Sequence, residues 1–183
     1  MKNWIKPLKR MDACADALEW CEDYESLVDA WADCQRGDWM LWLLGKLSGN
    51  PKSASRKKLV LVTCQCARLS LGYVKKGELR PLRAIEVAEA WARGGEGITL
   101  EDVRNAAYAG ASAAYASDAG SASYAASYAA SYAAACAAAA AAGYAACAAS
   151  YAAYAGTLAK CADIVREYYP DAPKLEQSSP TQD

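Results

Sequence analysis

The feature that most constrains this chain is a long stretch built almost entirely from Ala, Tyr and Ser. Between Ala106 and Ala159, 30 of the 54 residues are Ala, and the only charged residue is Asp118. Ala has the highest helix propensity of all residues, so this stretch is expected to be helical. A single helix from Thr99 to Tyr169 would be about 105 Å long at a rise of 1.5 Å per residue, far longer than a compact domain of this size. We therefore expect the stretch to fold back on itself.

The spacing of the Tyr residues supports the same conclusion. At about 100° per residue, the Tyr side chains of one continuous helix would fall on two opposite faces. One face would carry Tyr108, Tyr115, Tyr144 and Tyr151, and the other would carry Tyr124, Tyr128 and Tyr132. Breaks near Asp118–Gly120 and near Gly143 resolve this conflict and predict two or three antiparallel helices. Ala faces let helix axes approach to the lower end of the usual range of about 8–10 Å, so Tyr rings are expected to fill the remaining gaps.

The residues before this stretch read as conventional amphipathic helices. Asp12–Cys34 places apolar residues along one stripe and acids on the other face, which predicts one helix. Asp38 is expected to cap the apolar helix that follows it, and Ser53 or Ser55 to cap the next one. The segment Arg56–Leu71 is rich in β-branched residues, but its pattern continues for more than four turns, which favours a helix over a strand.

Two further helices complete the first half of the chain. The stretch "GYVKKGELRP" is expected to be a loop, with room for a small hairpin. Pro81 suits the first turn of a helix that the glycines from Gly94 to Gly97 would end. Thr99 is expected to cap the following helix, with Asp102 completing a variant of the capping box.

Together these patterns predict an all-α protein, a compact multi-helix bundle in which two or three Ala/Tyr-rich antiparallel helices pack closely. Residues 1–105 would form an amphipathic half, residues 106–169 would pack on it within one domain, and residues 170–183 would be a disordered tail. Residues 119–159 carry no charge and are long enough to span a bilayer. However, Ala is only marginally apolar, and Tyr, Ser and Gly recur, so stable membrane insertion is not expected.

The composition gives little support to enzymatic chemistry. The chain has no His, no Gly-rich phosphate loop and no nucleophile motif, so we expect neither a catalytic site nor a cofactor. Glu86 and Glu89 are three residues apart, and the simplest interpretation is a solvated helix face paired with Arg83 and Arg93.

The cysteines and the N-terminus bear on location and metal binding. The N-terminus is charged and lacks the apolar region of a secretory signal, which indicates a cytoplasmic protein with reduced thiols. Cys14 and Cys21 are seven residues apart, as core residues on one helical face would be. Cys64 and Cys66 lack the two-residue spacer of a zinc knuckle, so no metal site is expected.

Aromatic and Arg side chains are the candidate binding residues. The residues Trp31, Trp39, Trp42 and Trp91 are expected mainly in the core, but Trp and Arg residues are also typical anchors of protein interfaces. Tyr rings could instead stack a base while Arg side chains hold its phosphates. On these grounds the candidate residues are Trp39, Trp42, Arg68, Arg80, Arg83, Tyr124, Tyr128 and Tyr132.

Several stretches taken together resemble a known family. "GDWMLWLLGKL" (37–47), "RKKLVLVTCQCARLSL" (56–71) and "GELRPLRAIEVAEAWARG" (77–94) resemble the immunity-five-like helical domain of bacterial and phage immunity proteins. Members of that family also continue into a long Ala-rich stretch with aromatic residues, and the resemblance covers about residues 12–165. Members often place His among the Ala residues, whereas this chain has Tyr, which puts any His-dependent function in doubt.

The resemblance implies an all-helical domain that works by binding. The leading hypothesis is a non-enzymatic protein that neutralises a protein toxin or defence effector by stoichiometric binding. One alternative is a phage counter-defence protein that sequesters a small nucleotide signal. The other is a homo-oligomer in which the uncharged Ala/Tyr surface drives self-association as a helical scaffold.

Overall fold

All regular secondary structure in the computed structural model is helical across the residues that it describes, which are 1–116, 128–130, 132–136 and 157–175. The N-terminal elements are η1 (Asn3–Ile5), α1 (Lys6–Arg10), α2 (Ala15–Cys21) and α3 (Leu27–Asp33). They are followed by α4 (Gly37–Leu47), α5 (Ala54–Arg68), η2 (Leu71–Tyr73), α6 (Arg80–Ala92), α7 (Leu100–Tyr115) and α10 (Leu158–Tyr168). The predicted all-α class is therefore confirmed.

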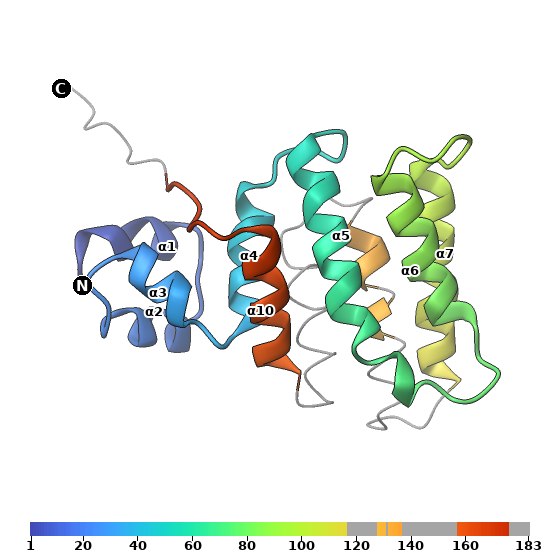
Figure 1. Cartoon of the computed structure of the whole chain (residues 1–183), viewed down its shortest axis with the longest axis horizontal. Coiled ribbons are helices and arrows are strands. Elements are labelled where there is room, and N and C mark those ends of the chain that lie inside the picture. Colours follow the sequence, from blue (N-terminus) through green and yellow to red (C-terminus); the bar gives the residue numbers. More distant parts are fainter. Residues whose placement is uncertain (117–127, 131, 137–156, 176–183) are drawn as a thin grey trace.

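The longer helices pack in a row (Figure 1). α4, α5, α6 and α7 follow one another across the molecule, and α10 lies against both α4 and α5. The short helices α1–α3 gather at the α4 end of the row, together with the N-terminus. The last of the described helices, α10, therefore packs against helices from the first half of the sequence, which connects the two ends of the described chain.

The helix expected over Asp12–Cys34 is two helices, so that prediction is wrong. α2 ends at Cys21 and α3 begins at Leu27, because Ser26 caps α3 by accepting a hydrogen bond from the Asp29 backbone N–H at 3.2 Å. Such a side-chain cap favours a helix start, and here it competes with continuation of α2. Cys14 lies just before α2 in extended backbone and is exposed, so only Cys21 joins the core as expected.

The cap expected for α4 is wrong, whereas the cap expected for α5 is confirmed. Asp38 is not the cap of α4; it lies within the first turn, where the Arg36 guanidinium donates to both of its carboxylate oxygens. Ser53 does cap α5 and accepts from the Arg56 backbone N–H at 3.1 Å. The choice of a helix for this β-branched segment is also confirmed.

The boundaries of α6 and α7 follow the sequence signals closely. Pro81 is in the first turn of α6, and the loop after it contains glycines with positive φ. Thr99 and Asp102 form the predicted capping box, with hydrogen bonds of 2.8 and 3.2 Å. The loop between α5 and α6 contains the 3-10 helix η2 and no hairpin.

In the Ala-rich half, α7 ends at Tyr115, close to the expected break, so one rod from Thr99 to Tyr169 is excluded. Residues 128–130 and 132–136 are helical, and their Ala side chains are fully buried against the core apart from a half-buried Ala135. The close packing expected of Ala faces is thus present in these residues. The break expected near Gly143 and residues 176–183 of the expected tail lie outside the described residues, whereas residues 170–175 of that tail are described.

Candidate interaction surface

A group of aromatic side chains lies where α2 meets α4. The Trp20 ring is 4.5 Å from the Tyr24 ring and 5.8 Å from the Trp39 ring, measured between centroids. Trp42 lies one helical turn after Trp39, and both are half-buried. We call these side chains, together with Arg36, the aromatic surface. It contains both of the Trp residues that the sequence singled out as binding candidates.

Arg36 gives this surface a fixed positive charge. Its guanidinium carbon lies 4.3 Å from the centre of the Trp39 ring, within the range of a cation–π contact. The same guanidinium donates to the buried Asp38 carboxylate at 2.8 and 2.9 Å, and this hydrogen bonding raises the pKa of Arg36. About 42% of the Arg36 side chain remains exposed, so the charge is positioned yet still accessible to a partner.

The space beneath the aromatic surface is small and apolar. A cavity of about 60 Å³ is lined by Trp20, Trp31, Trp39, Met40 and Trp42 among other apolar side chains. Ligand pockets for metabolites usually measure about 300–1,000 Å³. This cavity is too small to enclose a nucleotide, so the aromatic surface is suited to a partner that covers it from outside.

Arg68, predicted as a phosphate-binding residue, forms a bidentate ion pair with Glu89. Its Nε and Nη2 donate to the two carboxylate oxygens at 2.8 and 2.9 Å, and Arg93 adds a contact at 3.3 Å. Only 5% of Glu89 is exposed, so its expected place on a solvated face is wrong, whereas Glu86 is exposed. Burial alone would raise the pKa of Glu89, but Arg68 and Arg93 outweigh it and hold the pKa below its ordinary value.

Arg80 and Arg83 lie at the start of α6. The Arg80 guanidinium donates hydrogen bonds to the Glu78 carboxylate, and this hydrogen bonding lowers the pKa of Glu78 to about 2. Arg83 is exposed and forms no ion pair with any described residue. Because Arg68 and Arg80 bind different carboxylates, the candidate Arg residues do not share a counter-ion.

The described candidate tyrosines are packing residues. Tyr128 and Tyr132 stack with their ring centroids 5.8 Å apart, and Tyr128 is only 9% exposed. Both pack with the core or its margin, as expected for rings that fill gaps between Ala faces. Tyr124 lies outside the described residues. Of the tyrosines that the structure describes, Tyr108 and Tyr115 on α7 are the most exposed.

Several of the buried thiols have the environment of packing residues. Burial raises the pKa of Cys21 to about 11 and also raises the pKa values of Cys64 and Cys136. Such thiols are protonated near neutral pH and are poor nucleophiles. Among the described residues, no group of His, Cys, Asp or Glu is arranged to hold a metal ion.

Two Arg residues that the sequence did not single out have clear structural roles. Arg36 could have been found from its position three residues before Trp39, which is contact spacing on a helix. Arg56 is 1% exposed, and its guanidinium donates to the Cys136 carbonyl at 3.3 Å and to the Gly49 carbonyl at 3.0 Å. It thus links α5 to the Ala-rich residues, a role that a surface-like "SRKK" pattern does not reveal.

None of the helices in the described residues is both long enough and apolar enough to cross a bilayer. Residues 49–173 match the sequence model of a protein family described as "Imm-5 like putative immunity protein". No curated protein and no solved structure matches the chain significantly. The family match includes Arg68, Arg80 and Arg83 and begins after α4, so the aromatic surface precedes it. Because the matched residues make up more than half of the chain, the protein belongs to the Imm-5 like immunity protein family.

Proposed function

We propose that this protein neutralises a protein toxin or effector by binding it stoichiometrically, without turnover. Membership of an immunity protein family carries the proposal. The aromatic surface supports it, because Trp, Tyr and Arg are the residues most enriched among the energetic anchors of protein interfaces. Trp39 and Trp42 are half-buried in the free chain, so they are already positioned and lose little side-chain freedom on binding.

The alternative ligands would need different rearrangements. A nucleotide phosphate held by Arg68 or Arg80 would have to displace Glu89 or Glu78 from a bidentate ion pair. Base stacking on Tyr128 would have to open a buried contact. A partner protein that covers Trp39 and Trp42 requires neither change, which is why we favour it.

Native mass spectrometry of the tagged chain after exposure to bacterial lysate tests the proposal. We expect one added protein per chain, and the partner, once identified, should arrest growth when expressed alone but not with this chain. A small added mass would support nucleotide sequestration instead, and multiples of the chain mass would support self-association. Catalytic modification or cleavage of the partner would contradict the proposal.

The aromatic surface is tested with the identified partner. Replacing both Trp39 and Trp42 by Ala should weaken binding by about thirtyfold or more, as expected for interface anchors. Tyr108→Ala on α7 is the control, because Tyr108 is 67% exposed and lies at the other end of the row of helices. Equal effects of the control and of the Trp variant would exclude the aromatic surface as the contact.

A further inference from the structure

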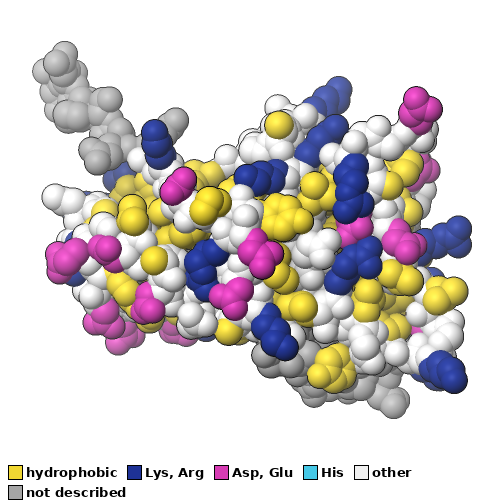
Figure 2. Space-filling model, in the orientation of Figure 1, with side chains coloured by type: hydrophobic (Ala, Val, Ile, Leu, Met, Phe, Trp, Pro, Cys, Tyr) yellow, Lys and Arg dark blue, Asp and Glu magenta, His cyan; other side chains and the backbone are white. Residues whose placement is uncertain are grey.

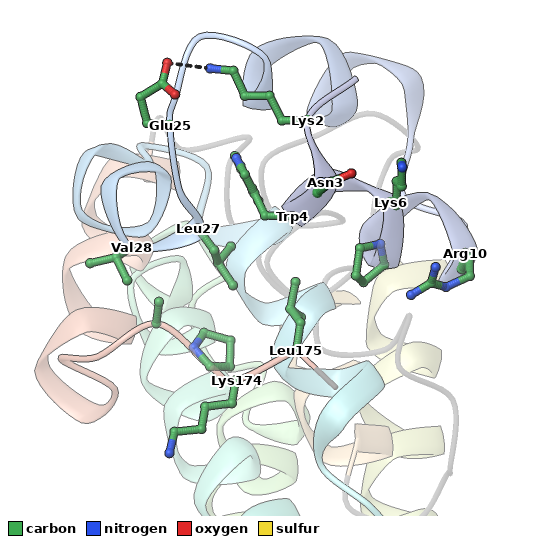
Figure 3. A pocket seen from close by; sticks show the side chains of 13 residues that line it. Lys2, Asn3, Trp4, Lys6, Arg10, Glu25, Leu27, Val28, Lys174 and Leu175 are labelled. Atoms are coloured by element: carbon green, nitrogen blue, oxygen red, sulfur yellow. Dashed lines mark hydrogen bonds and ion pairs between the residues drawn. The ribbon is translucent and has the colours of Figure 1, made fainter. Parts of the chain in front are cut away.

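A second recess lies at the α1–α3 cluster and shares only Leu27 with the lining of the smaller cavity. It has a volume of about 1000 Å³ and is formed by η1 and α1, by the start of α3, and by residues 172–175 after α10. Figure 3 shows Trp4, Leu27 and Leu175 around its centre, with Lys6 and Arg10 together on α1. We call this recess the basic groove. Its residues come from both ends of the described chain.

The walls of the basic groove are fixed by hydrogen bonds. The Tyr24 carbonyl accepts from the Lys2 ammonium at 2.8 Å and from the Trp4 indole at 3.3 Å. On the opposite side, the Trp31 indole donates to the Tyr169 carbonyl at 3.0 Å, which fixes the chain where it leaves α10. The groove is therefore formed before any ligand binds, which lowers the entropic cost of binding.

The charges in the basic groove are mostly positive and unpaired. Residues 1–11 contain four Lys or Arg and no acid, whereas residues 12–33 contain eight Asp or Glu and no base. Figure 2 shows acidic side chains gathered at the α1–α3 end of the molecule. Lys2 pairs with Glu25 at 3.0 Å, but Lys6, Arg10 and Lys174 form no ion pair with any described residue. These three cations are available to an acidic ligand.

The apolar side chains between these charges decide which ligand fits. Val28 is 66% exposed at the edge of the groove, and Trp4 and Leu175 are half-buried within it. A nucleic acid would present phosphates to the cations and leave this apolar surface uncovered. An extended peptide instead sends successive side chains to opposite sides, so it can offer carboxylates and apolar groups in turn.

We propose that the basic groove binds an extended acidic segment of a partner protein. Carboxylates of that segment pair with Lys6, Arg10 and Lys174, and its apolar side chains pack on Trp4 and Val28. The proposal concerns a different surface from the aromatic one and does not rest on the immunity function. The proposal for the basic groove would still hold if the protein partner were not a toxin.

Fluorescence anisotropy with a labelled peptide in which Glu and Leu alternate tests the charge requirement on the whole chain. We expect saturable binding that weakens as salt is added, and no binding of the matching Lys and Leu peptide. The double variant Lys6→Glu with Arg10→Glu should bind about tenfold more weakly or worse, since it replaces two exposed attractions by repulsions. Lys9→Glu is the matched control, because Lys9 is an exposed cation on α1 that does not line the groove. Equal losses in both variants would overturn the proposal.

A second pair of variants tests whether the apolar side chains of the groove contribute to binding. Val28→Asp should weaken binding of the Glu and Leu peptide at least about fivefold, because it removes an apolar contact and adds a like charge. Leu79→Asp should leave binding unchanged, since Leu79 is equally exposed, at 67%, and lies outside the groove. If the peptide fails to bind while phosphatidylserine vesicles or a single-stranded DNA oligonucleotide bind with the same sensitivity to Lys6 and Arg10, the proposal is wrong.

Discussion

At the scale of single residues, the most consequential group is the buried carboxylate of Glu89. It accepts two hydrogen bonds from Arg68 and one from Arg93, so these two cations balance its negative charge inside the bundle. Removing Arg68 would leave the buried Glu89 carboxylate without its main partner, which costs more than the intact ion pair contributes. The ion pairs therefore position α5 against α6 more than they add net stability.

Glu89→Gln should destabilise the fold by about 1–3 kcal/mol, which is below the cost for a fully buried pair because Arg68 stays partly exposed. Because the pKa of Glu89 is lower in the folded than in the unfolded chain, its carboxylate stabilises the fold above pH ~4.3, and this contribution is lost as pH falls through the folded value. Urea unfolding at pH 7 and pH 3 should therefore show a smaller penalty at pH 3. Glu86→Gln on the exposed side of α6 is the control.

Thiol reactivity provides a second test at this scale. Cys14 is exposed, whereas Cys64 and Cys66 are fully buried and have pKa values well above the ordinary thiol value. Brief alkylation with iodoacetamide at pH 7, followed by peptide mass mapping, should modify Cys14 and spare the other two. Equal labelling of all three would show that α5 opens far more readily than its burial implies.

At the scale of elements, α4 approaches α10 so closely that one position admits only Gly. A Cβ on Gly37 would lie 2.5 Å from the Cys161 Cβ and 2.7 Å from the Ala162 backbone N. Real Cβ atoms do not approach other atoms so closely, and α10 backbone cannot move aside as a flexible side chain would. Gly37 therefore begins α4 for a packing reason rather than acting as a helix breaker.

Gly37→Ala should destabilise the fold by about 1–3 kcal/mol, as overpacking of a core usually does, and lower the Tm accordingly. The matched control is Gly72→Ala, because a Cβ at Gly72 meets no atom within 4 Å and the residue does not need a positive φ. Thermal unfolding followed by circular dichroism measures both variants. A stable Gly37→Ala variant would mean that α4 and α10 can separate without cost.

At the scale of the whole molecule, the two ends of the described chain are joined. The Trp31 indole donates to the Tyr169 carbonyl, and the Arg166 guanidinium donates to the Cys34 carbonyl at 2.7 Å. α10 itself lies against α4 and α5. These contacts predict that the α1–α3 cluster unfolds together with the row of helices, as one cooperative unit.

The placement of Trp residues makes cooperativity measurable. Five of the six Trp residues lie before residue 43, and the sixth is Trp91 in α6. In a Trp91→Phe variant, fluorescence reports the α1–α3 cluster and α4, while circular dichroism reports all helices. We expect the two urea transitions to have the same midpoint. Separate midpoints would divide the chain into two unfolding units.

The sequence determined the local features of this protein, because helix signals depend on near neighbours. The Ser53 and Thr99 caps, Pro81 at the start of α6 and the helical state of α5 all follow from residues within one or two turns. The family resemblance likewise rests on short stretches of neighbouring residues. Trp39 and Trp42 could be named as binding candidates because large aromatic residues often anchor interfaces, but their exposure could not be predicted from the sequence.

Tertiary structure decided whatever depends on partners far away in the chain. The sequence could not show that Glu89 pairs with Arg68 from α5, that Arg56 reaches the Cys136 carbonyl, or that Gly37 faces Cys161. The basic groove is likewise assembled from segments near residues 2–10, 25–28 and 172–175. Charge balance, burial and close approach are properties of a side chain's surroundings in space, and only the packing of the helices fixes those surroundings.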